Sequence, residues 1–173
     1  MDKSYSAPVK NINIISESEL DLLKGLNPQS AEMPESNVIK QFDSVVDKNP
    51  DDVAIKLLPR KQSYAELKAE SIKIASFLKN EMNVKSGEIV CVLCDRIFEI
   101  PAIYLGILRA GCTFLPVDPE WPDERLDLII KDTKCRVVLT SQHPRHIAGA
   151  DFINVKSAYS DKPFTSADIQ PDS

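Results

Sequence analysis

The stretch from Leu108 to Leu126, LRAGCTFLPVDPEWPDERL, contains the junction that decides the fold class. Gly111 stands where a helix that begins near Glu99 is expected to end, and the apolar run 112–117 then predicts a strand inside a sheet. Pro122 and the two acids after it are typical of a helix start, where the positive end of the dipole favours carboxylates. We therefore interpret the acids of this stretch as turn and helix-start residues rather than as a metal-binding or acid–base cluster. These acids are Asp118, Glu120, Asp123 and Glu124.

On either side of this junction, apolar runs and helical patterns alternate. Strands are predicted at 52–58, 89–93, 112–117 and 135–140, and helices at 63–81, 99–110 and 122–133. The helix at 63–81 begins with a capping box formed by Ser63 and Glu66 and carries an apolar stripe. This stripe consists of Leu67, Ile74, Ala75 and Leu78. Strands without polar alternation indicate a parallel sheet that is covered on both faces, so the predicted fold class is α/β, a doubly wound but incomplete parallel-sheet domain.

The pattern divides the chain into three parts. Residues 1–33 form a polar lead-in with a short helix at 16–27, which Ser16 and Glu19 are expected to cap and Gly25 to end. Residues 34–140 form the first α/β part and begin with another helix, which stops before Pro50. The expected apolar face of that helix consists of Val38, Phe42, Val45 and Val46. Residues 141–173 are expected to be a weakly ordered connection with one further strand candidate at 152–155.

Composition and charge narrow the classes of partner. The chain has 173 residues and a formal net charge of -5, which argues against a nucleic-acid or anionic-membrane partner, because either would need a basic patch; we expect neither partner. No apolar run reaches the length of a transmembrane helix, and the first twenty residues lack the pattern of a signal peptide. A cytoplasmic location is therefore expected.

The four cysteines are expected to be reduced thiols in the core. Cys91 and Cys94 form a C-x-x-C, but residues three apart on a strand face opposite sides of the sheet and cannot share a zinc ion. Cys112 and Cys135 lie in other apolar segments, and nothing in the sequence indicates a secreted disulfide framework.

Neither the glycines nor the histidines form a recognisable site. A phosphate loop needs backbone amides that converge where side chains would clash, and none of the glycines has the spacing of such a loop. The five glycines are Gly25, Gly87, Gly106, Gly111 and Gly149. His143 and His146 are the only histidines, and Pro144 disfavours a helix that would bring them together, so a solvated loop is expected rather than a metal site. We assign no catalytic, cofactor-binding or metal-ligating residue in this chain.

Two segments resemble the start of the adenylation domains of nonribosomal peptide synthetases, within the adenylate-forming (AMP-binding) superfamily. QSYAELKAESIKIASFL is similar to the family's T-Y-x-E-L helix motif, and ILRAGCTFLPVDPEWPDERLDLIIKDT resembles its L-K-A-G-x-x-Y-x-P-x-D-P-x-x-P-x-x-R segment. The matching motif residues, expected to be architectural, are Tyr64, Glu66, Leu67, Leu108, Ala110, Gly111, Pro116, Asp118, Pro119 and Arg125. The departures from the pattern are Pro101, Arg109 (usually Lys) and Phe114 (usually Tyr).

The resemblance implies an ATP-dependent ligase that activates an amino acid or a related carboxylic acid. Such an enzyme uses ATP and magnesium to form an acyl-adenylate and then passes the acyl group to a phosphopantetheine thiol. In the family, the glycine-rich phosphate loop, the substrate pocket and the catalytic lysine all follow a stretch like Pro171–Ser173. The resemblance therefore implies an N-terminal segment that is inactive by itself. Its partners would be the rest of the adenylation domain or a complementary chain, and a carrier domain in the complete enzyme.

Two alternatives belong to other classes. In the first alternative, the chain is a naturally short, non-catalytic isoform or a split half that acts through protein–protein pairing. In the second, it is an independent small α/β binding module. The binding module ranks last, because the sequence lacks a cradle for a ligand.

Overall fold

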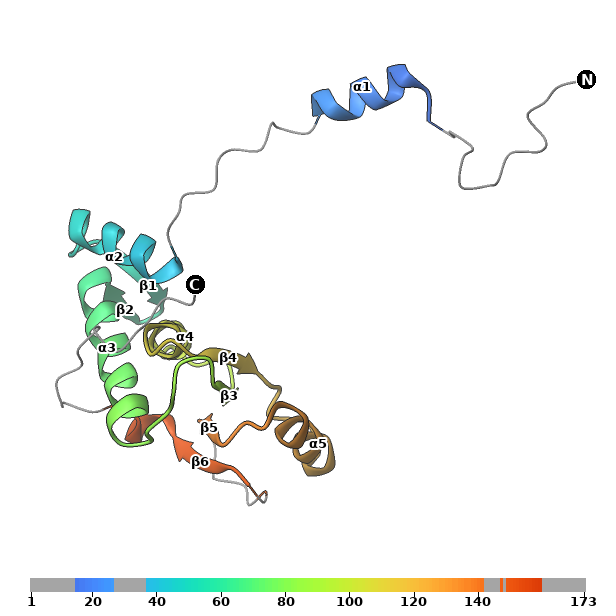
Figure 1. Ribbon diagram of the computed structural model, residues 1–173. Coiled ribbons are helices and arrows are strands. Elements are labelled where there is room, and N and C mark those ends of the chain that lie inside the picture. Colours follow the sequence, from blue (N-terminus) through green and yellow to red (C-terminus); the bar gives the residue numbers. More distant parts are fainter. Residues whose placement is uncertain (1–14, 27–36, 142–146, 148, 160–173) are drawn as a thin grey trace, which may run out of the picture. The chain divides into compact units, whose positions relative to one another are not determined.

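The computed structural model describes residues 15–26, 37–141, 147 and 149–159 (Figure 1). The chain splits into two compact units, Met1–Ser36 and Asn37–Ser173. The first unit contains α1 (Glu17–Leu26), which begins with the predicted capping box: the Ser16 N–H donates to Glu19 Oε2 (2.8 Å), and the Glu19 N–H donates to Ser16 Oγ (3.3 Å). The prediction that Gly25 ends this helix is wrong. A glycine cap requires a left-handed backbone, and Gly25 lacks a positive φ and lies inside α1.

The second unit contains a four-stranded parallel sheet, which confirms the predicted parallel-sheet class, but the strand predicted at 52–58 does not belong to it. Its strands are β3 (Ile89–Leu93), β4 (Thr113–Pro116), β5 (Val137–Thr140) and β6 (Asp151–Asn154). Their order in the sheet is β4-β3-β5-β6, and each neighbouring pair is parallel. The strand candidate at 152–155 corresponds to β6. The rest of the predicted connection at 141–173, including His143 and His146, lies mostly outside the described residues.

Helices cover both faces of this sheet, which confirms the doubly wound arrangement. Figure 1 shows α3 (Tyr64–Asn80) and α4 (Ile100–Arg109) on one side and α5 (Asp123–Thr133) on the other. Successive residues of β3 divide accordingly: Val90 and Val92 pack in the cluster with α3 and α4, and Cys91 and Leu93 pack in the cluster with α5. The predicted stripe of α3 is buried, with each of its four residues between 0% and 4% exposed.

The junction at Gly111 has the predicted geometry. The φ of Gly111 is +71°, and its N–H donates to the Leu108 carbonyl (3.0 Å) while the Cys112 N–H donates to the Ile107 carbonyl (3.1 Å). This pair of bonds is a Schellman motif, which satisfies carbonyls at the end of α4. The chain then enters β4 directly, and α5 begins at Asp123 after Pro122 in the N-cap position.

A β-hairpin precedes α3, and only half of it was predicted. β1 (Val53–Leu57) pairs antiparallel with β2 (Arg60–Ser63). β2 has the sequence RKQS, which lacks the apolar run expected of a strand, so its pairing with β1 decides its conformation. The Ser63 and Glu66 capping box then begins α3 as predicted.

The helix α2 (Val38–Lys48) buries only part of its predicted apolar face. Val46 is buried and Phe42 packs against the main core, but Val38 and Val45 are 60% and 39% exposed. α2 lies against α3 and α4 through only part of its apolar stripe. None of the described helices is long and apolar enough to cross a membrane.

The cysteines are free thiols in buried surroundings, and Cys91 and Cys94 pack into different core clusters as predicted. Burial raises the pKa of Cys91 to about 12 and of Cys94 and Cys112 to about 11. Burial also raises the pKa of Cys135.

We predict that these thiols are protected from alkylation in the folded chain. Because a thiolate is the reactive form, iodoacetamide near neutral to mildly alkaline pH should label them at least about 100-fold more slowly than in denaturant. Mass spectrometry of chain alkylated with and without denaturant measures this ratio for each cysteine. A thiol that is labelled equally fast in both conditions would contradict the buried placement of that residue.

Candidate functional site

The candidate site lies at the carboxyl edge of the parallel sheet, because ligands of doubly wound folds bind where the strand order reverses at that edge. From β3 the chain passes through α4 to β4 on one side, and from β4 through α5 to β5 on the other side of β3. The reversal therefore lies between β3 and β5. The residues that directly follow these two strands are Cys94, Asp95 and Ser141.

Hydrogen bonds join the two strand ends at this point. The Asp95 N–H donates to Ser141 Oγ (3.1 Å), and the Ser141 hydroxyl donates to Asp95 Oδ2 (3.4 Å). The Cys94 thiol donates to the Leu139 carbonyl (3.6 Å), and its raised pKa, caused by burial, keeps it protonated. The arrangement positions one carboxylate and one hydroxyl but offers no activated thiolate nucleophile.

Two hollows flank the reversal point. One, of about 480 Å³, lies at the ends of β3 and β4, and its lining includes Asp95, Arg96, Tyr104, Asp118 and Glu120. The other, of about 400 Å³, lies at the ends of β5 and β6, and its lining includes Glu99, Ser141, Asn154, Lys156 and Tyr159. Both hollows carry charges of both signs. In the part of the chain that the structure describes, no group of three or more His, Cys, Asp or Glu side chains is arranged to hold a metal ion.

The acids of the junction have local partners. Asp118 Oδ1 accepts a hydrogen bond from the Glu120 N–H (2.9 Å), which closes a turn after β4. Asp123 and Glu124 stand in the first turn of α5, as predicted. The guanidinium of Arg125 lies 3.7 Å above the Trp121 ring, so it stacks on the same turn.

The glycines with a left-handed backbone lie at the opposite, amino edge of the sheet. Gly87, Gly111 and Gly149 have positive φ angles and precede β3, β4 and β6, and the Gly87 N–H donates to the Gly111 carbonyl (2.7 Å). Phosphate loops follow the carboxyl end of a strand. Between the described strands and the helices that follow them, the chain therefore has no glycine-rich turn that would face a phosphate.

The structure brings only some of the predicted motif residues to the candidate site. Pro116, Asp118 and Pro119 line the hollow at the ends of β3 and β4. The others lie elsewhere: Tyr64, Glu66 and Leu67 in the first turns of α3, Leu108, Ala110 and Gly111 at the end of α4, and Arg125 on α5. Their architectural rather than catalytic role stays a prediction.

Asp95 and Ser141 were not predicted as site residues, although the sequence carries a signal for them. Each directly follows a buried strand, and polar residues at the carboxyl ends of parallel strands meet at one edge. The sequence also carried no sign of the strand order, which brings these two residues together from 46 positions apart.

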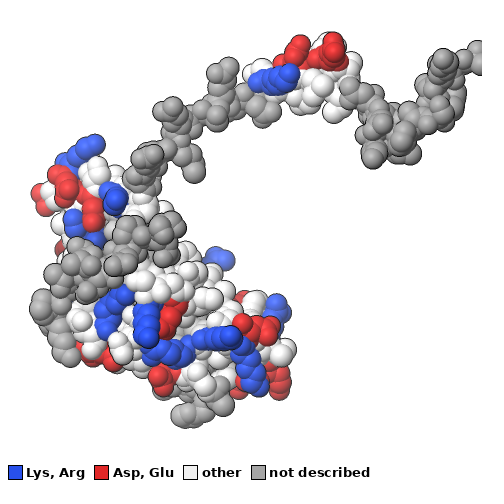
Figure 2. Space-filling view, in the orientation of Figure 1, with Lys and Arg blue, Asp and Glu red and all other residues white. Residues whose placement is uncertain are grey.

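Figure 2 shows Lys and Arg side chains that form a band across one face of the second unit, with Asp and Glu side chains beside it. One contact between side chains of opposite charge is the Arg136–Glu88 ion pair (3.1 Å), near the amino edge of the sheet. The face seen in Figure 2 therefore carries both positive and negative side chains.

Comparison with known proteins agrees with this architecture. Residues 42–171 match the family described as AMP-binding enzyme. The chain is 34% identical over 136 residues to gramicidin S synthase 2 of Brevibacillus brevis, a match that covers 78% of this chain and 3% of that protein. Its fold is similar to that of the nonribosomal peptide synthetase FmoA3, with a TM-score of 0.77, 22% identity, and coverage of 91% of this chain and 17% of that one.

A second solved structure has the same fold. It is NpsA-ThdA of Klebsiella oxytoca, an artificially fused adenylation–PCP di-domain, with a TM-score of 0.63, 22% identity, and coverage of 70% of this chain and 23% of that one. The chain thus spans less than a quarter of each of these three proteins. Because the family match extends over most of its length, this chain belongs to the AMP-binding enzyme family.

Proposed function

We propose that this chain is the N-terminal segment of an ATP-dependent ligase that activates an amino acid or a related carboxylic acid. The complete enzyme forms an acyl-adenylate and then a phosphopantetheine thioester, and this segment supplies the scaffold. The observation that carries the proposal is the family match over residues 42–171, which includes the whole described parallel sheet. The likeness to an adenylation–PCP di-domain supports a carrier domain as a partner of the complete enzyme.

The described residues do not fit an ATP site by themselves. Their left-handed glycines lie at the amino edge of the sheet. The hollow at the ends of β3 and β4 is lined by three carboxylates (Asp95, Asp118 and Glu120) and one cation (Arg96), where a triphosphate would need backbone amides and an excess of cations. ATP, magnesium and phosphopantetheine are therefore proposed only for the complete enzyme. The segment depends on the remainder of the adenylation domain, or on a complementary chain, for its chemistry.

The 173-residue chain is expected to show no amino-acid-dependent ATP–pyrophosphate exchange. Exchange is measured with each of the common amino acids, and a heat-denatured sample gives the background. The positive arm is the protein encoded when the reading frame is extended through a complete adenylation domain. This protein should show ATP–pyrophosphate exchange with at least one acid.

The three possible results of this exchange experiment distinguish between the proposed functions. Exchange by the 173-residue chain alone would overturn the claim that this segment lacks the chemistry. A folded, extended protein that exchanges with no acid would overturn the adenylation proposal itself. Exchange that appears only after a separate chain is added would favour a split half that acts through protein pairing.

A further inference from the structure

The hairpin formed by β1 and β2 has a free strand edge. Among the described residues, β1 pairs only with β2, and these two strands form a sheet of their own. The N–H and C=O groups on the outer edge of β1 therefore have no strand partner in that part of the chain. A two-stranded sheet is marginally stable by itself, and an unpaired edge is a template for a further strand. The outer edge of β1 is thus a place where this fold can accept another chain.

Apolar side chains of β1 and of the hairpin turn are left exposed. Ala54 and Ile55 pack against the main core. Val53 and Leu57, at the two ends of the strand, are 52% and 55% exposed, and Leu58 in the turn is 76% exposed. The neighbouring strand β2, with the sequence RKQS, has no apolar side chain. Of the two hairpin edges, the edge of β1 therefore offers the apolar surface that a partner would cover.

The charges along this edge are divided between its two ends. Asp51 and Asp52 directly precede β1, and Lys56 lies near the other end of the strand. All three residues are exposed, and no ion pair joins any of them to another described residue. Lys56 also lies directly opposite Lys61 of β2, and like charges in that position repel each other. The basic end of the edge therefore favours an acidic neighbour.

We propose that the outer edge of β1 pairs with the same edge of a second copy of this chain, in antiparallel orientation. In this orientation, the acidic end of each strand lies beside the basic end of the other, so Asp51 and Asp52 of one copy meet Lys56 of the other. A parallel pair would instead place acids beside acids. The arrangement is two-fold symmetric, so each favourable contact occurs twice.

The same symmetry changes the role of the edge lysine. A lysine on an edge strand ordinarily keeps other strands away, because an approaching strand must accommodate its charge. Here the charge of Lys56 attracts the acidic end of an identical strand and so selects this chain as its own partner. This inference does not depend on the proposed function.

Sedimentation velocity of the 173-residue chain near pH 7 tests for the dimer. A pair of five-residue strands is smaller than a stable interface, so we expect reversible association with a Kd on the order of 0.1 mM. Amide hydrogen exchange shows where the copies meet. Exchange within Val53–Leu57 should slow as the protein concentration rises, because pairing protects the amides of the edge.

Two charge variants test which contacts select the partner. Lys56→Glu makes both ends of the edge acidic, and the double variant Asp51→Lys with Asp52→Lys makes both ends basic. Each variant alone is expected to dimerise at least about tenfold more weakly, because the two-fold symmetry makes each repulsion act twice. An equimolar mixture of the two variants should associate about as well as the unaltered chain, because an acidic edge then meets a basic edge.

Lys85→Glu is the matched control. It makes the same change of charge in the segment before β3, outside the hairpin, and is expected to leave the dimer unchanged. Thermal melts of every variant check that it is folded.

Four results would overturn the proposal. The first is a chain that stays monomeric at about 1 mM. The second is a dimer whose formation leaves exchange of the β1 amides unchanged, and the third is a mixture of the two charge variants that associates no better than either alone. The fourth is a monomer whose β1 amides are already protected at low concentration, because another segment of the same chain would then cover the edge.

Discussion

Replacing Gly106 by alanine is expected to lower the free energy of unfolding by about 1–2 kcal/mol, because overpacking a core costs about 1–3 kcal/mol and the helix recovers about 1 kcal/mol. An added Cβ at this position would lie 2.7 Å from both Cβ and Cγ2 of Ile74 and 3.0 Å from the Ser71 carbonyl oxygen. Ile74 is fully buried, its Cβ is fixed to the backbone of α3, and its Cγ2 could move away only by leaving the χ1 rotamer that a β-branched side chain prefers in a helix. The gain of about 1 kcal/mol in helix propensity from glycine to alanine only partly offsets this cost.

Denaturant unfolding measures this effect as a lower midpoint at an unchanged m-value. Gly25→Ala is the matched control, because Gly25 also lies within a helix but its added Cβ would meet nothing within 4 Å. That control is expected to leave the unfolding of the second unit unchanged. Equal midpoints for Gly106→Ala and the unaltered chain would show that α3 and α4 do not pack as closely as described.

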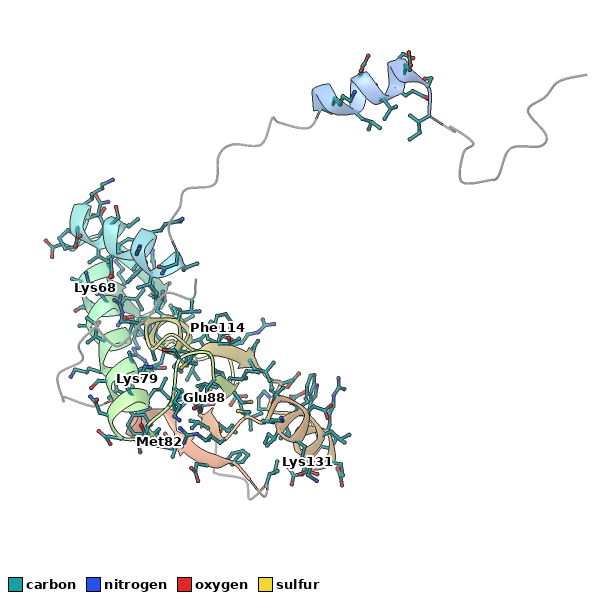
Figure 3. The ribbon with its side chains drawn as sticks, viewed as in Figure 1. Lys68, Lys79, Met82, Glu88, Phe114 and Lys131 are labelled. Carbon is teal, nitrogen blue, oxygen red and sulfur yellow. The ribbon has the colours of Figure 1, made fainter. Side chains whose placement is uncertain are left out.

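Replacing Asp43 by alanine is expected to cost about 2–4 kcal/mol, because it leaves a buried guanidinium without its counter-ion. The side chain of Arg109 is 8% exposed and donates to both carboxylate oxygens of Asp43 (2.7 and 3.0 Å) and to Ser71 Oγ (3.3 Å). Lys68, on the part of α3 beside α2 (Figure 3), lies 3.4 Å from the same carboxylate. The cluster thus connects α2, α3 and α4 through a guanidinium that is largely shielded from water.

Asp47→Ala is the control for this substitution. Asp47 also lies near Lys68 (3.7 Å), but its side chain is 75% exposed, so its removal should cost less than about 1 kcal/mol. Urea denaturation of both variants gives the comparison. If the two midpoints shift equally, the Arg109 contact contributes nothing beyond an exposed ion pair.

The same cluster predicts a pH dependence. Partial burial by itself would raise the pKa of Asp43, but the hydrogen bond and charge of Arg109, together with Lys68, hold the pKa below its ordinary value of 3.8. The unfolded chain then binds more protons in this range, so the stabilisation is complete above about pH 4 and is lost as the pH falls through the lower pKa of the folded state. The acid limb of the stability curve should be shallower in Asp43→Ala.

Local chemistry was sufficient for much of the fold. The capping boxes at Ser16 and Ser63, the helix end at Gly111 and the apolar strands were predictable because each depends on residues within a few positions of one another. The unalternated strands also indicated a sheet buried on both sides. The exposure of Val38 and Val45 was not predictable, because a periodic stripe does not say how much of it a neighbouring helix will cover.

The amino-acid sequence by itself determined most element types, the doubly wound class and the resemblance to adenylation domains, whereas the strand β2 depended on its pairing with β1. The tertiary structure alone decided which distant residues meet: Asp43 with Arg109 across 66 positions, and Asp95 with Ser141 across 46. It also decided that Gly106 serves close helix packing rather than a turn. The physical reason is that caps and periodic faces arise from contacts within one or two turns of chain. Strand order and buried polar contacts depend on how whole elements pack.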